Sequence, residues 1–212
     1  MPNKAIGIID AQRGFMPADE GIRLGVAGFG ELPIAGGEQI VATVNQLLAV
    51  GHARGGTLFT TQDWHPAQTA HFSATPNFTT TWPVHCVADT AGAELHPHIV
   101  LPAETHRFRK GAEVLQNGAD DTSYSAWYAS AAGLSLPDFL RMRGVETIYL
   151  AGLAFDYCVG RTALDLAQQG GWRVVVLYDA TRAVAEASDA AMQQSLRDAG
   201  VLLTSTTAFF TA

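Results

Sequence analysis

Four residues with chemically capable side chains stand at or near the ends of short apolar segments: Asp10, Asp63, Lys110 and Cys158. A cysteine thiolate is a strong nucleophile, a carboxylate can take the thiol proton and return it to departing ammonia, and an ammonium group stabilises both anions. Cys158 also stands at the start of a predicted helix, where exposed amides and the helix dipole favour a thiolate. If the fold brings them together, Asp10, Lys110 and Cys158 predict a nucleophilic amidohydrolase.

Each of these residues also has an ordinary structural interpretation. A cysteine is often a small buried hydrophobe, an aspartate after a strand is often a cap or turn residue, and a lysine is usually solvated. The joint appearance of an acid, an amine and a thiol at strand ends favours the chemical interpretation.

A second group of candidates lies in the segments TQDWHPAQTAHF and TWPVHC, which contain Asp63, His65, His71 and His85. Imidazoles and a carboxylate suit zinc, iron or manganese. Asp63 and His65 are two positions apart and therefore point to the same side of an extended segment. We expect one divalent transition metal ion here; loop histidines without a ligand are the alternative.

The elements that must position these groups alternate along the chain. Short apolar runs predict strands, and apolar residues at helical spacing predict helices. The predicted strands are 4–9, 57–61, 105–108, 147–150, 173–177 and 201–204, and the predicted helices are 38–50, 137–143, the segment from Cys158 to Gly170 and 187–199. Residues 11–37 and 64–103, rich in Gly or Pro, are expected to be long loops, which in compact domains are usually functional.

This alternation predicts an α/β fold in which residues 1–212 form a single domain. Its core would be a doubly wound, mainly parallel six-stranded sheet with helices on both faces. Such sheets hold ligands at the carboxyl ends of their strands, and Asp10, Asp63, Lys110 and Cys158 all map to that edge.

The composition narrows the range of partners. The formal net charge of -7 argues against a nucleic-acid partner, because phosphate binding needs clustered Lys and Arg. No stretch approaches the ~20 apolar residues that a membrane span requires, and the amino-terminal apolar run is too short for a signal peptide. We therefore expect a cytoplasmic protein with free thiols at Cys86 and Cys158. A homo-oligomer is compatible with these features.

Several motifs together resemble one family. The segments are IIDAQRGF, TQDWHPAQTAHF, TWPVHC, FRKGAE, TSYSAW and GLAFDYCVGRTALDL. In this order, and over nearly the whole chain, they resemble the nicotinamidase/pyrazinamidase branch of the isochorismatase-like hydrolases. The resemblance implies hydrolysis of nicotinamide, and also of pyrazinamide, through a cysteine thioester, in a role such as NAD salvage or nitrogen scavenging. The expected partner is a small heteroaromatic amide.

The resemblance also implies roles for individual residues. It implies a catalytic triad of Asp10, Lys110 and Cys158, and an oxyanion hole formed by the backbone amides of Ala154 and Cys158, with a cis peptide bond between Leu153 and Ala154. The implied metal ligands are Asp63, His65 and His85, with His71 as a fourth ligand that only some members possess. The implied substrate-binding residues are Phe15 and Trp82, which would sandwich the ring, and Tyr124.

Rival interpretations remain open at this point. Another amidohydrolase with the same triad could act on an N-carbamoyl or related small amide. An isochorismatase-type vinyl-ether hydrolase would need neither the cysteine nor the metal site. A metabolite-binding or partner-binding domain on the same scaffold would need no catalysis, and a zinc-storing or redox-sensing protein could also use His and Cys.

Overall fold

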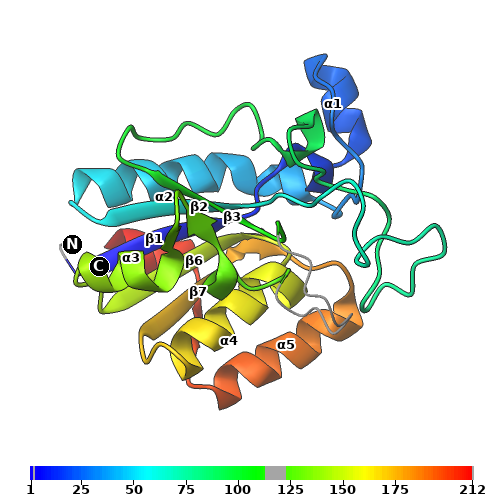
Figure 1. Ribbon diagram of the computed structural model, residues 1–212. Helices are drawn as coiled ribbons and strands as arrows, with labels where there is room; N and C mark the ends of the chain where they lie inside the picture. The colour runs from blue at the N-terminus through cyan, green and yellow to red at the C-terminus, as the bar shows by residue number, and fades with distance from the viewer. Residues whose placement is uncertain (2, 113–122, 212) are drawn as a thin grey trace.

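The structure is a computed structural model that describes residues 1, 3–112 and 123–211. Its centre is an eight-stranded sheet with the strand order β5-β4-β3-β2-β1-β6-β7-β8, covered by helices on both faces (Figure 1). Six of the strands pair in parallel; they are β1 Lys4–Ile9, β2 Thr57–Asp63, β3 His106–Lys110, β6 Thr147–Leu153, β7 Arg173–Arg182 and β8 Leu202–Thr204. The predicted α/β class and its mainly parallel sheet are confirmed.

The predicted count of six strands is wrong, because the sheet has two further antiparallel strands at the β3 edge. These are β4 Ser130–Ala131 and β5 Leu134–Ser135. The turn between them uses Ala132 and Gly133, both at positive φ. Strands of two residues leave no alternating or continuous apolar run in the sequence, so periodicity cannot reveal them.

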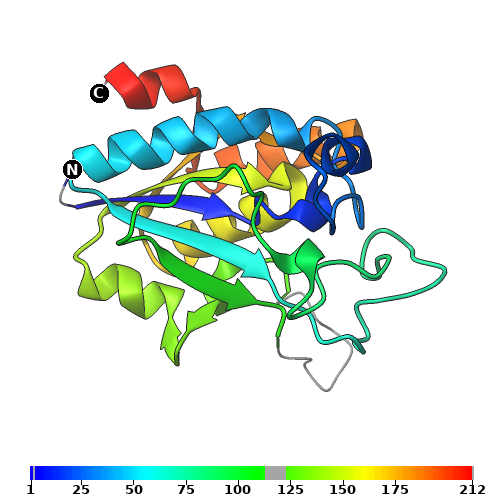
Figure 2. The ribbon, with the colours of Figure 1, turned by 90° about the horizontal axis from the view of Figure 1, so that it is seen from above.

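The helices divide between the two faces of the sheet. In chain order, the α-helices of the described residues are α1 Ala18–Leu24, α2 Val41–Ala53, α3 Leu136–Met142, α4 Gly160–Gln168, α5 Glu186–Asp198 and α6 Thr206–Thr211. Helices α2 and α6 pack on one face, whereas α3, α4 and α5 pack on the other, as Figures 1 and 2 show. Helix α2 turns Val44, Leu47 and Leu48 into the core, as its apolar spacing predicts.

Two of these helices were not expected. Helix α1 lies inside the segment 11–37 that the sequence predicts to be irregular, and α6 follows the last predicted strand. Helix α1 buries only Glu20 and Gly21, and its Ile22 is 83% exposed. Its short length and exposed surface remove the apolar periodicity that marks a packed helix.

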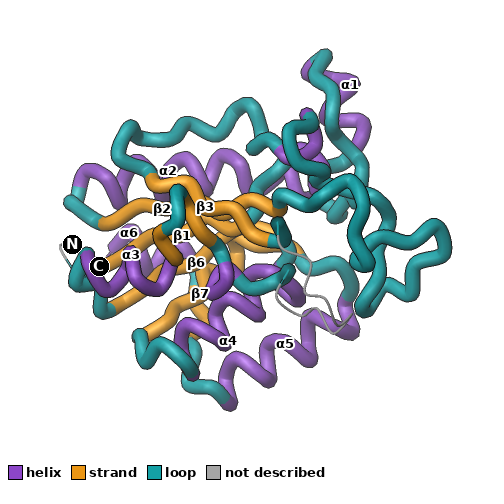
Figure 3. Tube along the Cα trace, in the orientation of Figure 1, coloured by secondary structure: helices purple, strands orange, loops and turns teal. Residues whose placement is uncertain are grey.

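The order of the parallel strands creates a switch point at the centre of the sheet. From β1 the chain moves outward through β2 and β3, and then returns to the other side of β1 to build β6, β7 and β8. Open sheets of this kind bind ligands outside the carboxyl ends of the strands where the order reverses. The loops gather beyond these strand ends in Figure 3, and residues 64–103 contribute much of them.

The switch point requires a close approach between β1 and β6. Gly152 lies opposite Ile9 in the register and has a φ of +120°, and a Cβ at this position would lie 2.0 Å from the carbonyl oxygen of Ile9. A side chain at Gly152 would therefore push the ends of the two strands apart.

None of the helices in the described ranges combines the length and apolar character needed to cross a lipid bilayer. One domain over 1–212 stays a prediction.

Candidate active site

The register of the sheet brings the predicted residues to one place. Asp63 and Lys110 end β2 and β3 and are paired neighbours, so their side chains leave the sheet on the same side. Asp10 directly follows β1, with a φ of 45°. Cys158 comes from a single π-helical turn, Phe155–Val159, between β6 and α4. The strand ends thus deliver an acid, an amine and a thiol from distant parts of the sequence.

The Lys110 ammonium group is the centre of this cluster. Its Nζ atom lies 2.9 Å from Oδ2 of Asp10 and donates hydrogen bonds to Oδ1 of Asp63, to the carbonyl oxygen of Ser123 at 2.7 Å and to Sγ of Cys158 at 3.3 Å. The lysine is only 1% exposed, and the other side chains of the cluster are buried too. The ammonium therefore replaces its lost hydration with two carboxylates, a carbonyl and a sulfur.

One oxygen of Asp10 remains available for proton transfer. The hydroxyl of Thr61 donates to Oδ1 of Asp10 at 2.6 Å. Oδ2 lies 2.9 Å from Nζ of Lys110. A carboxylate oxygen has two lone pairs, so a contact with one ammonium proton leaves the other lone pair able to accept the thiol proton. The oxygen can therefore act as a base.

The electrostatic environment shifts the pKa values of the two carboxylates in opposite directions. Burial and the nearby charge of Asp63 raise the pKa of Asp10, against the opposing effect of Lys110. Burial would also raise the pKa of Asp63, but Lys110, His65 and His85 together hold it below its usual value. Asp63 therefore stays ionised, whereas Asp10 is the more basic carboxylate.

Burial dominates the pKa of the thiol, whereas the neighbouring charges dominate the pKa of the amine. Burial raises the pKa of the Cys158 thiol well above its usual value, because the pull of Lys110 only partly offsets desolvation and the two carboxylates. Burial would lower the pKa of Lys110, but the carboxylates and the sulfur raise it well above the ordinary lysine value. The resting pair is thus a protonated thiol beside a permanent cation, and a base is needed to generate the nucleophile.

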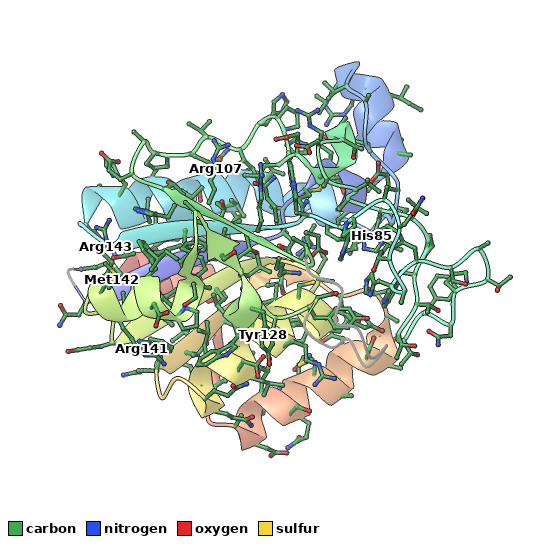
Figure 4. All side chains as sticks on the ribbon, viewed as in Figure 1. His85, Arg107, Tyr128, Arg141, Met142 and Arg143 are labelled. Carbon is green, nitrogen blue, oxygen red and sulfur yellow. The ribbon has the colours of Figure 1, made fainter. Side chains whose placement is uncertain are left out.

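Three histidines form a compact group next to this cluster. Ligand atoms of His65, His71 and His85 all lie within 4.8 Å of one another, and all three side chains are buried. The ring of His65 lies 4.9 Å from that of His71 and 5.1 Å from that of His85. Figure 4 shows His85 among the loops beyond the strand ends, across the molecule from Arg143, which follows α3. The structure therefore brings together all three histidines singled out in the sequence.

The hydrogen bonds of the histidines suit metal ligation. Nδ1 of His65 faces the carbonyl oxygen of Gly111 at 3.2 Å, and Nδ1 of His85 faces that of Pro83 at 2.7 Å. If each Nδ1 donates to its carbonyl, each Nε2 presents a lone pair, which is the usual arrangement around a bound metal ion. Nε2 of His65 is buried, has no hydrogen-bond partner among the described residues, and lies 3.7 Å from Oδ2 of Asp63.

The protonation states agree with this fit. Burial and the neighbouring His65 lower the pKa values of both His71 and His85 to about 4, so both rings are neutral near pH 7. Neutral imidazoles and an ionised carboxylate are the donor set that zinc and related divalent metals take. Asp63 faces both clusters, with one oxygen toward Lys110 and the other toward His65.

A cavity opens above both clusters. It encloses about 480 Å³ between the protein atoms, including its mouth. The three aromatic residues that the sequence resemblance assigned to the substrate, Phe15, Trp82 and Tyr124, all line it, and so does Cys158. Sequence reasoning missed the other walls, which come from Leu32, Pro33, Ile34, Tyr157 and Val184. These residues lie in loops or turns, and only the position of Tyr157 next to the cysteine could have pointed to it.

The turn that carries the cysteine is fixed from both sides. The Leu153–Ala154 peptide bond that precedes it is cis, as the resemblance implied. Asp156, within the turn, accepts hydrogen bonds from the backbone amides of Val184 and Ala185 at 2.9 and 3.2 Å. The carboxylate thereby ties the segment before α5 to this turn and holds Val184 at the cavity wall.

Gln12 is a further buried residue that the sequence did not single out. Its amide oxygen accepts from the backbone N–H of Asp63, and its Nε2 donates to the carbonyl oxygens of Asp63 and Ala93, each at 2.8 Å. A side chain after β1 therefore replaces the missing ladder partners at the end of β2. This contact fixes the backbone from which Asp63 reaches both clusters.

The comparisons with known proteins agree with this geometry. The family model described as "Isochorismatase domain" matches residues 4–208. A curated relative from Acinetobacter baylyi, named "Nicotinamidase", is 36% identical over 203 residues, which cover 86% of this chain and 82% of the relative. The solved pyrazinamidase of Pyrococcus horikoshii in complex with zinc is 29% identical, with a TM-score of 0.78, and the match covers 96% of this chain and 99% of that one. The solved PnC1 from L. infantum in complex with nicotinate is 32% identical, with a TM-score of 0.77 and coverages of 98% and 94%.

Replacing Gln12 with alanine tests its supporting contact. In Gln12→Ala, the buried amide and carbonyl of Asp63 lose their partners, and the free energy of unfolding should fall by about 2–4 kcal/mol. Denaturant unfolding measures this loss. Gln46→Ala, at an exposed position of α2, is the matched control and should stay within about 0.5 kcal/mol of the parent protein. Equal stability of the Gln12 and Gln46 variants would show that the contact is dispensable.

Proposed function

The chain belongs to the isochorismatase family, and on this premise we propose that it hydrolyses nicotinamide to nicotinate and ammonia, and accepts pyrazinamide as a related substrate. The observation that carries the proposal is the buried contact of Lys110 with both Asp10 and Cys158, whose side chain lines an aromatic-walled cavity. The names of the relatives supply the substrate class, since the curated protein from Acinetobacter baylyi is a nicotinamidase and the solved protein from L. infantum binds nicotinate.

In the proposed reaction, Oδ2 of Asp10 takes the proton of Cys158 as the sulfur attacks the carboxamide carbon. The raised pKa of Asp10 brings its basicity closer to that of the thiol, which favours this transfer. Asp10 then gives the proton to the departing ammonia, and a thioester remains. Water, deprotonated by the same carboxylate, cleaves the thioester and returns nicotinate and the free thiol.

The charge that develops during attack needs two kinds of support. The Lys110 ammonium, 3.3 Å from Sγ, stabilises the thiolate as it forms. The backbone amides of Ala154 and Cys158 are proposed to hold the oxyanion, because Ala154 lines the cavity and Cys158 stands in the first turn of the helical segment that leads into α4. A donor of this kind can contribute about 3 kcal/mol to the transition state.

The metal site is proposed to consist of Asp63, His65, His71 and His85. A zinc, iron or manganese ion held there would supply an electron-pair acceptor for the ring nitrogen of the substrate, directly or through a water molecule. The residues of the chain complete the recognition: Phe15, Trp82 and Tyr124 contribute aromatic rings to the cavity wall. Aromatic walls favour a heteroaromatic amide over an aliphatic N-carbamoyl amide.

Removing the thiol tests the covalent mechanism. Cys158→Ala should lower the rate of ammonia release from nicotinamide at least about a thousandfold, because no other thiol lines the cavity walls that the structure describes. A coupled ammonia assay over a panel of nicotinamide, pyrazinamide and an aliphatic N-carbamoyl amide measures the loss and the substrate preference. Cys86→Ala, which removes the other cysteine, should retain most of the activity. Near-normal ammonia release by Cys158→Ala would rule out a thioester.

Metal content tests the second cluster independently of activity. After chelation and reloading with zinc, the parent protein should hold about one ion per chain, and His85→Ala should hold much less, because it removes one of the proposed ligands. Elemental analysis after gel filtration gives the ratio. His52→Ala, which removes an exposed histidine of α2, should bind zinc as the parent does. A parent protein that retains no zinc under these conditions would refute the site.

A further inference from the structure

The loop 71–82 carries two residues of the site at its ends. His71 begins it and Trp82 closes it, and the two ends are joined by backbone hydrogen bonds of 2.9 Å from Trp82 to His71 and from Ser73 to Trp82. Both His71 and Trp82 line the cavity. Two backbone hydrogen bonds therefore fix the base of the loop, and the position of the rest of the loop depends on the contacts at its far end.

The far end of this loop is a preorganised tip, residues 77–81. Oδ1 of Asn77 accepts hydrogen bonds from the backbone amides of Thr79, Thr80 and Thr81 at 3.0, 2.8 and 2.9 Å. The amide of Phe78 donates to the carbonyl oxygen of Thr81 at 3.0 Å. One side chain thus satisfies three amides at once, so the tip forms one hydrogen-bonded unit.

Two tyrosine hydroxyls hold this tip from the side of the active site. Tyr157 donates to the carbonyl oxygen of Phe78 at 3.2 Å, and Tyr124 donates to that of Thr79 at 3.1 Å. Nε1 of Trp82 donates to the Tyr124 hydroxyl at 2.7 Å. The rings of Trp82 and Tyr157 also meet edge to face, with centroids 4.9 Å apart. Tyr157 therefore contacts the loop at both its tip and its base.

We propose that the hydroxyl of Tyr157 is a positioning group for substrate binding: by holding the carbonyl of Phe78, it ties the loop 71–82 to the turn that carries Cys158 and keeps Trp82 in place as a wall of the pocket. This inference rests on the proposed function, because it assigns Trp82 to the amide substrate. Tyr157 precedes Cys158 in the sequence, so the same turn presents the nucleophile and anchors the opposite wall.

The proposal separates binding from chemistry. The Tyr157 hydroxyl faces the loop, while the sulfur of Cys158 faces Lys110. Loss of the hydroxyl would leave the ring and the acid–amine–thiol cluster in place, but of its two tyrosine bonds the tip would keep only the one from Tyr124 to Thr79 and would be held less firmly. The substrate would then have to order Trp82 when it binds, which raises KM and leaves kcat nearly unchanged.

The first arm of the test compares Tyr157→Phe with the parent protein. We expect KM for nicotinamide to rise about twofold to tenfold, the factor that one ordinary hydrogen bond supplies, with kcat within about twofold. Amide hydrogen exchange at residues 79–82 should become faster in the free protein. Tyr178→Phe is the matched control, since it also removes a tyrosine hydroxyl, here one that bonds Asp189 and Gln193 of α5, and it should change neither quantity.

The second arm asks whether the hydroxyl acts through the tip. Asn77→Ala, which removes the three-amide acceptor, should reproduce the rise in KM, and Asn77→Asp, which keeps an acceptor oxygen, should restore most of the parent value. In the Asn77→Ala background, the additional change Tyr157→Phe should have little further effect, because both changes loosen the same unit.

The outcomes decide the inference separately from the proposed function. Unchanged exchange at residues 79–82 in Tyr157→Phe would overturn the tether. Faster exchange with unchanged KM, or additive effects of the two changes, would overturn the role in substrate binding. A parent protein that releases no ammonia from nicotinamide would refute the proposed function. The hydrogen-exchange comparison needs no substrate, so it would still test whether the Tyr157 hydroxyl holds the loop.

Discussion

The arrangement of the active-site edge depends on one buried cation. Lys110 has its ammonium group out of water, and a charge in that position is tolerated only where fixed groups replace its hydration. Those groups come from the end of β1, the end of β2, the loop after residue 122 and the turn after β6. Each of these segments must therefore hold its position for the ammonium to remain buried, and the ammonium in turn holds the carboxylates and the sulfur within contact distance.

The charges around Lys110 also connect the two clusters. When both carboxylates are ionised, they leave an excess of one negative charge over the single ammonium in a desolvated region. Neutral His71 and His85 do not offset it. A divalent cation at the proposed histidine site would offset it, because Asp63 turns its second oxygen toward His65. The proposed metal and the proposed nucleophilic cluster are therefore electrostatically complementary, and Asp63 is the residue that couples them.

The sequence predicts the parts of the site that strands deliver. Asp10, Asp63 and Lys110 can be assigned to one edge because the parallel strands are apolar runs whose ends are visible, and parallel strands end on the same side. The aromatic walls came only from the family resemblance, because an aromatic residue in a loop carries no positional signal of its own. The contacts of Gln12 and Tyr157 with distant backbone groups have no local pattern at all.

The difference between local sequence patterns and tertiary contacts also explains which elements of the fold the sequence did not predict. A strand is detectable when it buries several residues, and β4 and β5 bury too few to form a pattern. Segment 64–103 contains no strand and only the 3-10 turn Ala91–Ala93, yet it surrounds buried histidines. Buried backbone without a ladder must find side-chain partners, and Gln12 and Gln62 supply them at Ala93. Such partners are set by the tertiary fold, so short-range sequence patterns do not reveal them.

The final assignment follows from the contrast between two like carboxylates. Asp10 and Asp63 are both buried and both contact Lys110, so desolvation and the shared cation cannot distinguish their roles. Asp63 has in addition the imidazoles of His65 and His85, which keep its pKa low, whereas Asp10 has only the hydroxyl of Thr61 and the repulsion of Asp63. Where neighbouring acids have their pKa values pushed apart, the one with the raised value exchanges protons and the other stays charged. The geometry therefore favours Asp10 as the base of the proposed reaction and Asp63 as the anionic partner of the metal.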